Sequence, residues 1–538
     1  MRKLLIYAAA CAALVDFGPG CRSAQAGSVA FGQGSWQPAI VFRQLFDCLY
    51  NQAQGGGGGA VGIPRPGAWP KAKSCVSFND SNLGGEILYE GNGFSNYRSN
   101  FLFGGIGDSS DVFDDRFYSF FELLFGVVTY TDTSLGISSV AQYDKLQFIA
   151  GESPVDAAEV AAWNKNGNPA KFGNIVQFPV AASPVALAFA GTDGNGHPLN
   201  ILQPTPAGGS SGLNLSRNAL CGIYSGHITK WNNPILTALN GGVLGSGQIT
   251  VVVSDGAPNF LFTSSLASQC QFEIGPNNES DQTLVSYAFP WTDREGACPH
   301  PVARGSFKTN WPAFRTNDQC NTPNPVPTGS HFWGARWISE IVVALAYPLP
   351  PGTSGPLINF RGAIGLVPLE YINDPTLITA SPLVHGDKLM AINIESNWDV
   401  TAGTGQFQPP TWQGARLAMS QATPQFDSTT RLNPLAWSLQ GLVPDPVVQG
   451  AYPISGFTWV QMYQCYAPHA SGNNPFIWFR NFLDYLYSSD EARNILHENG
   501  FAEVSPAWIV EIYRLATDPQ YGPTQSGLGG CANIPGAL

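Results

Sequence analysis

Residues 208–212 read GGSSG and match the G-x-S-x-G pattern, in which a serine nucleophile lies on a sharp turn between a strand and a helix. That chemistry needs a strand before the turn, whereas the preceding QPTP at residues 203–206 is typical of a loop. The pattern therefore does not indicate a hydrolase. The seven histidines are dispersed without an H-E-x-x-H spacing, and no P-loop or dinucleotide-binding fingerprint is present. We predict no catalytic residues, no bound metal, no cofactor and no enzyme activity.

One glycine-rich turn has the composition of a weak anion site. FGGIGDSSD at Phe103–Asp111 places Asp108 at its centre. Backbone N–H groups of such turns bind anions, but this one carries no lysine or arginine to assist them. By itself it is a poor cradle for phosphate.

The chain begins with a predicted secretory signal at residues 1–26. Arg2 and Lys3 precede an apolar run from Leu4 to Val15, and the AQA that follows supplies small residues for cleavage before Gly27. The apolar run is shorter than the roughly 20 residues of a membrane span. We therefore expect a periplasmic or extracellular protein, with no transmembrane segment after signal removal.

The charge balance argues against one class of partner. The chain has a formal net charge of −12, and removal of three basic residues and one acidic residue with the signal makes it −14. Proteins that bind nucleic acid need a basic surface. We expect no nucleic-acid partner.

The ten cysteines divide by position. Cys11 and Cys21 lie in the signal, and Cys21 would carry lipid in the alternative of a lipoprotein, although Gly18 stands where such signals have leucine. Eight cysteines remain in the mature chain: Cys48, Cys75, Cys221, Cys270, Cys298, Cys320, Cys465 and Cys531. An even number in an exported chain predicts that all eight form disulfides. They allow on the order of a hundred pairings, so the sequence does not assign partners.

The elements that would position a site alternate between strands and helices. Residues 173–190, 247–256 and 361–372 are predicted strands, and 474–501 has the 3.6-residue apolar period of a helix. Single strands separated by helices favour α/β layers. Insertions rich in glycine and proline, or without periodicity, lie near residues 51–75, 270–335 and 374–449. Cys270, Cys298 and Cys320 share the second insertion, so at least one bridge should hold it.

The segment GIYSGHITKWNNPILTALNGGVLGSGQITVVVSDG at residues 222–256 resembles a signature of the PstS-type phosphate-binding proteins that serve ABC transporters. Further blocks resemble that family in the same order along the chain. They are GQGSWQPAIVFRQLF at 32–46, EILYEGNGFSNYRS at 86–99, FGGIGDSSD at 103–111, QFPVAASPVALAFA at 177–190, RGAIGLV at 361–367 and AYPISGFTWVQM at 451–462.

This resemblance implies an α/β, type II periplasmic binding protein fold. Two α/β lobes are joined by crossing strands, with a ligand cleft between them. Residues 27–188 and 451–538 are expected to form lobe one, and residues 189–450 lobe two. The family holds one phosphate through helix N-termini, hydroxyls, one arginine and one aspartate. Its partners would be a small-molecule or anion ligand and an ABC permease, or else a surface assembly.

Carried over residue by residue, the family's phosphate site is depleted. The candidate ligand-binding residues of the cleft are Ser35, Trp36, Phe94, Ser95, Asp108, Ser109, Ser254, Asp255 and Asn259. Four of the family's donor positions fall on Trp36, Phe94, Val253 and the Ala257–Pro258 pair, none of which supplies the expected donor. Only the aspartate is retained, as Asp108. Because a desolvated anion needs compensating donors, we expect weak phosphate binding or none.

Three hypotheses follow from this depletion. The cleft could take a different ligand, neutral or aromatic, with Trp36 and Phe94 stacking on it. The fold could instead serve a structural or surface-interaction role without a ligand, with these aromatic residues filling the old cavity. Oxyanion binding could also persist through donors from the insertions, such as Arg98 or Arg116. The open or filled state of the cleft discriminates the first hypothesis from the second.

Overall fold

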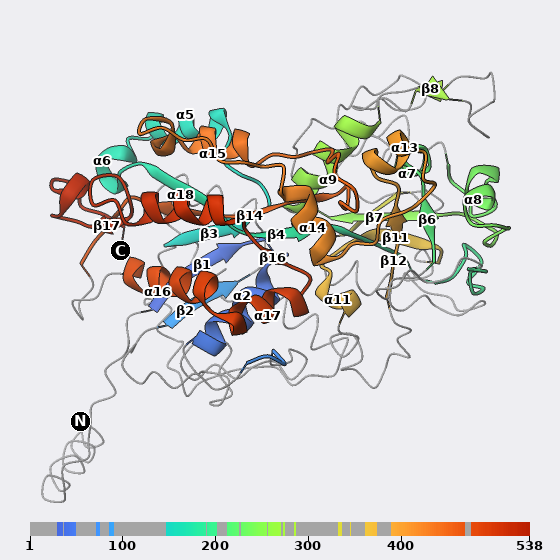
Figure 1. Ribbon diagram of the computed structural model, residues 1–538, viewed down its shortest axis with the longest axis horizontal. Coiled ribbons are helices and arrows are strands. Elements are labelled where there is room, and N and C mark those ends of the chain that lie inside the picture. The colour runs from blue at the N-terminus through green and yellow to red at the C-terminus, as the bar shows by residue number, and fades with distance from the viewer. Residues whose placement is uncertain are drawn as a thin grey trace, which may run out of the picture.

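The computed structural model describes residues 29–35, 37–49, 72–75, 86–90, 147–189, 191–201, 212–224, 228–254, 257–270, 273–274, 285–286, 332–335, 345, 361–373, 389–468 and 475–537. Two β-sheets organise this part of the chain, and each is covered by helices (Figure 1). This is the α/β architecture that the alternating strands and helices predict.

The first sheet has six strands in the order β16-β4-β14-β3-β1-β2. They are β1 (Val29–Gly34), β2 (Glu86–Glu90), β3 (Phe148–Gly151), β4 (Ile175–Pro184), β14 (Ser455–Tyr463) and β16 (Ala502–Glu503). β1 runs parallel to β2 and β3, whereas β14 is antiparallel to β3 and β4. Helices α2 (Ala39–Leu49), α16 (Pro475–Ser488) and α17 (Asp490–Glu498) lie on one side of this sheet, and α5 (Ala157–Lys165), α15 (Pro434–Gln440) and α18 (Pro506–Ala516) on the other (Figure 1).

The second sheet has five strands in the order β10-β7-β11-β5-β12. They are β5 (Ala186–Phe189), β7 (Thr250–Ser254), β10 (Phe332–Ala335), β11 (Ala363–Val367) and β12 (Met390–Ala391). β7, β10 and β11 are mutually parallel, and β5 pairs antiparallel with β11 and β12. Trp231 is buried in the core of this half, and its indole N–H donates to the Gly362 carbonyl at 3.3 Å.

Shorter elements complete the described chain. They are α6 (Pro169–Phe172), β6 (Asn214–Leu215), α7 (Arg217–Tyr224), α8 (Pro234–Leu239), α9 (Pro258–Gln269), β8 (Glu273–Ile274), β9 (Val285–Ser286), α11 (Glu370–Asn373), β13 (Asn393–Ile394), α13 (Asn397–Ala402), α14 (Trp412–Met419), β15 (Cys465–Tyr466) and β17 (Thr524–Gln525). No helix among the described residues is long and apolar enough to cross a bilayer.

Two adjacent segments carry the chain between the sheets. β4 belongs to the first sheet and β5 to the second, so the chain crosses at Val185. The second crossing, just before β14, lies beside it: the Val185 N–H donates to the Ile454 carbonyl at 2.8 Å, and the Tyr452 hydroxyl donates to the Val185 carbonyl at 3.2 Å. These hydrogen bonds between the two crossing segments hold both sheets at one junction.

Two segments differ from their predicted form. The single helix expected at residues 474–501 is two helices, α16 and α17, because Ser489 adopts an extended backbone and its side chain accepts from the Ala492 N–H as an N-cap. The strand expected at 361–372 ends at Val367, and α11 follows at Glu370. From the 374–449 segment, Met419 and Trp437 pack into the core of the first sheet.

Disulfides join three pairs of cysteines. Cys48 bonds to Cys75, Cys221 to Cys270 and Cys465 to Cys531. The prediction of disulfides is confirmed for these six residues. Cys298 and Cys320 lie outside the described residues. Cys270, at the start of the predicted second insertion, is tied to α7.

Candidate functional site

The carboxyl ends of the parallel strands place polar side chains at the junction of the two sheets. Ser35 follows β1, and Glu152 follows β3, its parallel neighbour. In the second sheet, Glu370 follows β11, and α9 follows β7. Ligands of open α/β sheets bind outside the carboxyl ends of the strands. The side chains at these strand ends therefore define the candidate site.

Ser35 and Glu152 form a short hydrogen bond at the centre of this junction. The Ser35 N–H pairs with the Ala150 carbonyl at 2.8 Å, which holds Ser35 beside the end of β3. Its hydroxyl donates to Glu152 Oε2 at 2.6 Å. The backbone N–H of Gln37 in turn donates to Ser35 Oγ at 3.1 Å, and the Thr458 hydroxyl donates to Glu152 Oε1 at 3.2 Å. The hydrogen bonds of this loop thus lead from the Gln37 N–H to the Ser35 hydroxyl and from that hydroxyl to the Glu152 carboxyl.

Both carboxyls of the junction are withdrawn from water. Glu152 is 0 % exposed, and burial raises its pKa to about 7 against the lowering effect of the hydrogen bonds from Ser35 and Thr458. Glu370 is 1 % exposed, and neither of its oxygens has a hydrogen-bond partner among the described residues. Burial raises the pKa of Glu370 well above its usual range, and the charge of Glu152 raises it further. No described lysine or arginine offsets either carboxyl.

The β4–β14 ladder supplies one wall. Ser183 lies opposite Gly456, and Ala181 lies opposite Thr458, so these four residues share a face of the sheet. Thr458 is the residue on that face that donates to Glu152. The Ser183 hydroxyl is buried on the same face without a hydrogen-bond partner among the described residues.

A sequence profile of the PBP superfamily domain matches residues 126–327. Solved structures similar to it over nearly the whole chain include the periplasmic phosphate-binding protein PfluDING, with a TM-score of 0.53, 17 % identity, and coverage of 94 % of this chain and 98 % of that one. A phosphate-binding protein from Stenotrophomonas maltophilia has a TM-score of 0.52 and 18 % identity, with 95 % and 99 % covered. These likenesses establish the α/β phosphate-binding protein fold.

Two curated proteins are distant relatives of this chain. Alkaline phosphatase L of Pseudomonas aeruginosa is 21 % identical over 365 residues, which span 68 % of this chain and 72 % of the relative. A protein named phosphate-binding protein, from an unknown prokaryotic organism, is 24 % identical over 157 residues, or 28 % of this chain and 35 % of the relative. The solved structures confirm the predicted fold class, and the domain match and the named relatives are consistent with the predicted family.

The candidate residues chosen from the sequence fall in different places. Ser35 lies at the junction, in the hydrogen bond to Glu152. Ser254 is the last residue of β7, and Asn259 is 3 % exposed in the first turn of α9, where its carbonyl accepts from the Thr263 hydroxyl at 2.7 Å. The remaining candidates lie outside the described residues: Trp36, Phe94, Ser95, Asp108, Ser109 and Asp255.

The amino end of α9 has few donors for an anion. Pro258 occupies its first turn and has no N–H, and Ala257 makes no side-chain cap. An anion at a helix N-terminus needs the free backbone N–H groups of the first turn. Pro258 thus leaves this first turn one backbone donor short.

Sequence reasoning missed Glu152, Thr458 and Glu370. Glu152 lies in FIAGES at residues 148–153, in which an apolar run leads into Gly-Glu-Ser where the strand ends, and this was a usable signal. Thr458 carries no such mark, because its role depends on the pairing of β14 with β3 and β4 across the chain. Glu370 follows VPL and reads as an ordinary first-turn acid of a helix.

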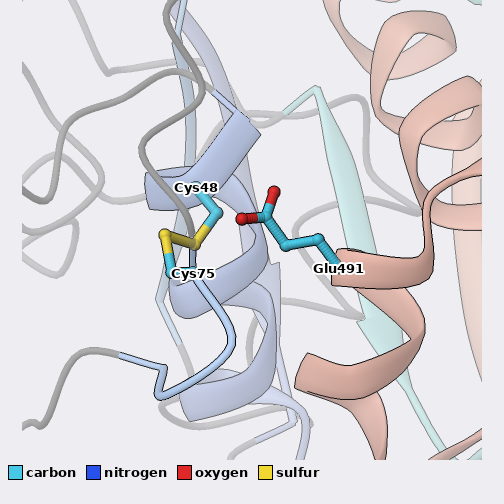
Figure 2. A group of neighbouring side chains, drawn as sticks. All are labelled: Cys48, Cys75 and Glu491. Carbon is cyan, nitrogen blue, oxygen red and sulfur yellow. A yellow bond between two sulfur atoms is a disulfide. The ribbon is translucent and has the colours of Figure 1, made fainter.

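A second group of side chains consists of residue types that often bind metals, but its bonding does not leave these residues free to do so. Cys48, Cys75 and Glu491 bring their ligand atoms within 4.8 Å of one another (Figure 2). The two cysteines are joined in a disulfide, so neither supplies the thiolate that binds a metal. Glu491 accepts a hydrogen bond from the Tyr485 hydroxyl at 3.0 Å. The disulfide joins α2 to the 72–75 segment, and the Lys73 N–H of that segment donates to Glu498 of α17 at 2.8 Å.

Proposed function

We propose that this chain is an exported solute-binding protein whose interlobe site discriminates against phosphate. The PBP fold supports a binding role. Export is supported by the predicted signal at residues 1–26 and by the disulfides, which persist in oxidising compartments. We propose two lobes with the ligand site between them, divided close to the bounds expected from the sequence, except that β5 joins the second sheet from Ala186 and that α14 and α15 of the 189–450 segment pack on the first sheet.

The observation that carries this proposal is the direction of the donors around Ser35. In a site for a dehydrated anion, hydroxyls and backbone N–H groups point at the ligand. Here the Gln37 N–H donates to Ser35, and the Ser35 hydroxyl donates to Glu152. A phosphate entering this junction would meet two buried carboxyls and few free donors. Burying an unpaired charge is strongly unfavourable, so phosphate should remain in water.

The chemistry of the junction supports binding rather than catalysis. Hydrolysis by Ser35 would need a general base to accept its proton and donors to stabilise the oxyanion. Glu152 is in place to accept that proton, but α9 begins with a residue that lacks an N–H. The named activity of the distant relative alkaline phosphatase L makes this worth a direct assay with p-nitrophenyl phosphate, for which we expect no turnover.

Calorimetry with inorganic phosphate on the full mature chain, stripped of ligand and refolded, tests the proposal. We expect no saturable heat at millimolar phosphate. A dissociation constant in the micromolar range or below would show that donors from the insertions have rebuilt an oxyanion site. Glu152→Gln and Glu370→Gln, measured in parallel, should then report whether the carboxyls oppose the anion, because removal of either should tighten phosphate binding.

A further inference from the structure

A cluster of four side chains ties α14 to the end of α17. The indole of Trp412, the first residue of α14, stacks on the imidazole of His497 with ring centroids 3.6 Å apart and an angle of 4° between the ring planes. Nε2 of His497 lies 2.9 Å from Oε2 of Glu503, in β16. Arg416, one turn after Trp412, donates to the Glu503 carboxylate at 3.4 Å, and its guanidinium lies 5.1 Å from the centroid of the Trp412 ring. The cluster therefore joins the 374–449 segment to the C-terminal part of the chain.

α14 also contacts one of the two segments that cross between the sheets, and it lies where the two halves of the molecule meet (Figure 1). The Tyr452 N–H, at the start of the second crossing, donates to the Gly414 carbonyl of α14 at 3.2 Å. A Cβ added at Gly414 would lie 3.0 Å from the Tyr452 Cβ, so helix and crossing segment are in direct contact. The Tyr452 hydroxyl in turn donates to the Val185 carbonyl, on the first crossing. A chain of contacts thus leads from His497 through α14 to both crossings, which together form the hinge between the sheets.

We propose that His497 is a pH-dependent brace of this hinge: its protonated imidazole holds the first turn of α14 against α17, and its neutral form loosens that turn and the crossing segment bonded to it. The inference goes beyond the proposed function, because it requires no particular solute. Histidine is the side chain that changes its charge between about pH 5 and 8. As a cation it is attracted to the face of the Trp412 indole and to the Glu503 carboxylate more strongly than a neutral ring is.

Charged groups surround His497 on three elements. On β16, Glu503 stays ionised across that range, because the hydrogen bond with His497 is the main cause that lowers the pKa of Glu503 to about 2. On α14, the Arg416 side chain is 52 % exposed, so solvent screens its repulsion of a protonated imidazole. On α17, Arg493 lies one turn before His497 and pairs with Asp490 at 2.7 Å. The charge hydrogen-bonded to the imidazole is therefore the Glu503 carboxylate, which attracts the protonated ring.

A purely structural contact would show the same geometry. A neutral imidazole also stacks on an indole, and it also donates one hydrogen bond. The two roles differ in their dependence on pH, because only the brace weakens when the ring loses its proton. The His497 side chain is 20 % exposed, so its protonation can follow the pH of the solvent.

Hydrogen exchange read by mass spectrometry on the full mature chain, without added ligand, tests the brace. The readouts are peptides that cover residues 411–420 of α14 and residues 448–455 of the crossing. Chains are compared at the same pH, so the intrinsic effect of pH on exchange cancels. At about pH 5.5, where histidine is mostly protonated, His497→Gln should lower the protection of both peptides about three- to tenfold, and at about pH 8.5 the loss should shrink below about twofold.

Two further variants make the test specific. Glu503→Gln keeps an acceptor for the imidazole but removes the charge, so it should lessen the same dependence on pH. His197→Gln removes a histidine that is 67 % exposed and lies beside Asp193 in the other half of the molecule. This control variant should change the protection of neither peptide at either pH.

Each outcome supports or overturns the brace. A loss of protection of the same size at both pH values would make His497 a structural contact and refute the inference. A loss confined to residues 411–420, with residues 448–455 unchanged, would refute the link to the hinge. Should His497→Gln fail to fold, the comparison of Glu503→Gln with the unmodified chain decides, because an equal difference at both pH values would again exclude a role for the charge. Phosphate titrations bear on the proposed function alone and leave this result unaffected.

Discussion

Leu261 of α9 occupies the space above Gly456 of β14 that any side chain at Gly456 would need. A Cβ added there would lie 2.2 Å from Leu261 Cδ2, well inside contact distance. α9 belongs to the core of the second sheet, and β14 is a strand of the first, so this contact joins the two halves of the molecule. The absence of a side chain at Gly456 thus allows the two halves to pack closely. The glycine is not there to permit a backbone turn.

Gly456→Ala should push the two halves apart. Overpacking of this kind typically costs about 1–3 kcal/mol of stability, and relief by movement of α9 would enlarge the molecule. We expect a lower midpoint in urea unfolding and a larger radius of gyration in small-angle scattering. Leu261→Ala in the same chain should recover the compact radius, because it removes the colliding atoms. An unchanged radius in the single variant would show that Leu261 yields locally.

Stability should fall as pH rises between about 4.5 and 7. In the folded protein the pKa of Glu152 is raised to about 7, whereas the same carboxyl in the unfolded chain has a pKa near 4.5. The folded state thus holds the extra proton in that window, and each pH unit removes up to about 1.4 kcal/mol from the unfolding free energy. Glu370, whose pKa is also raised by burial, adds to the same trend. Urea unfolding as a function of pH should show a shallower slope for Glu152→Gln than for the unmodified chain.

Glu503 should act in the opposite sense at lower pH. Its hydrogen bond with His497, 2.9 Å long, is the main reason that its pKa is lowered to about 2, and Arg416 adds to the effect at 3.4 Å. Stability from this carboxylate is present above its unfolded pKa of about 4.5 and is lost as pH falls toward 2. Glu503→Gln should cost on the order of 1 kcal/mol at pH 6, because the group is partly exposed. The difference from the unmodified chain should disappear near pH 2.

All eight mature cysteines should be oxidised in pairs, so thiol titration of the denatured, unreduced chain should find no free thiol. Two or more free thiols would contradict the pairing. Cys465→Ser together with Cys531→Ser should lower the unfolding free energy by about 2–5 kcal/mol. That bond closes a loop of 66 residues and fixes the C-terminal segment beside β15. Ser420→Ala, at an exposed position, is the control variant for effects of sample preparation.

The sequence predicted the fold better than the site, and particular residues show why. The strands at β4, β5, β7 and β11 are marked by short apolar runs, and the order of the family-like blocks indicates how they assemble. Ser35 could be placed because GQGSWQPAIVFRQLF at residues 32–46 resembles the family's first strand, turn and helix. Thr458 could not, because its hydrogen bond to Glu152 depends on the pairing of β14 with β3. Glu370 could not, because it lies at the end of β11 in the other sheet. The sequence pattern around a residue does not indicate which distant residues it contacts in the folded chain.

The pairing of β3 with β14 has a consequence for how the molecule is made. Gly151 lies opposite Trp459, and Ile149 opposite Gln461, so a central neighbour of the early strands is synthesised long after them. Until β14 emerges, β3 and β4 lack the strand that lies between them, and their edges are open to other chains. Such non-local closure makes folding slow and favours aggregation of the nascent chain. The first half of this polypeptide therefore keeps open strand edges at β3 and β4 until its last quarter has been made.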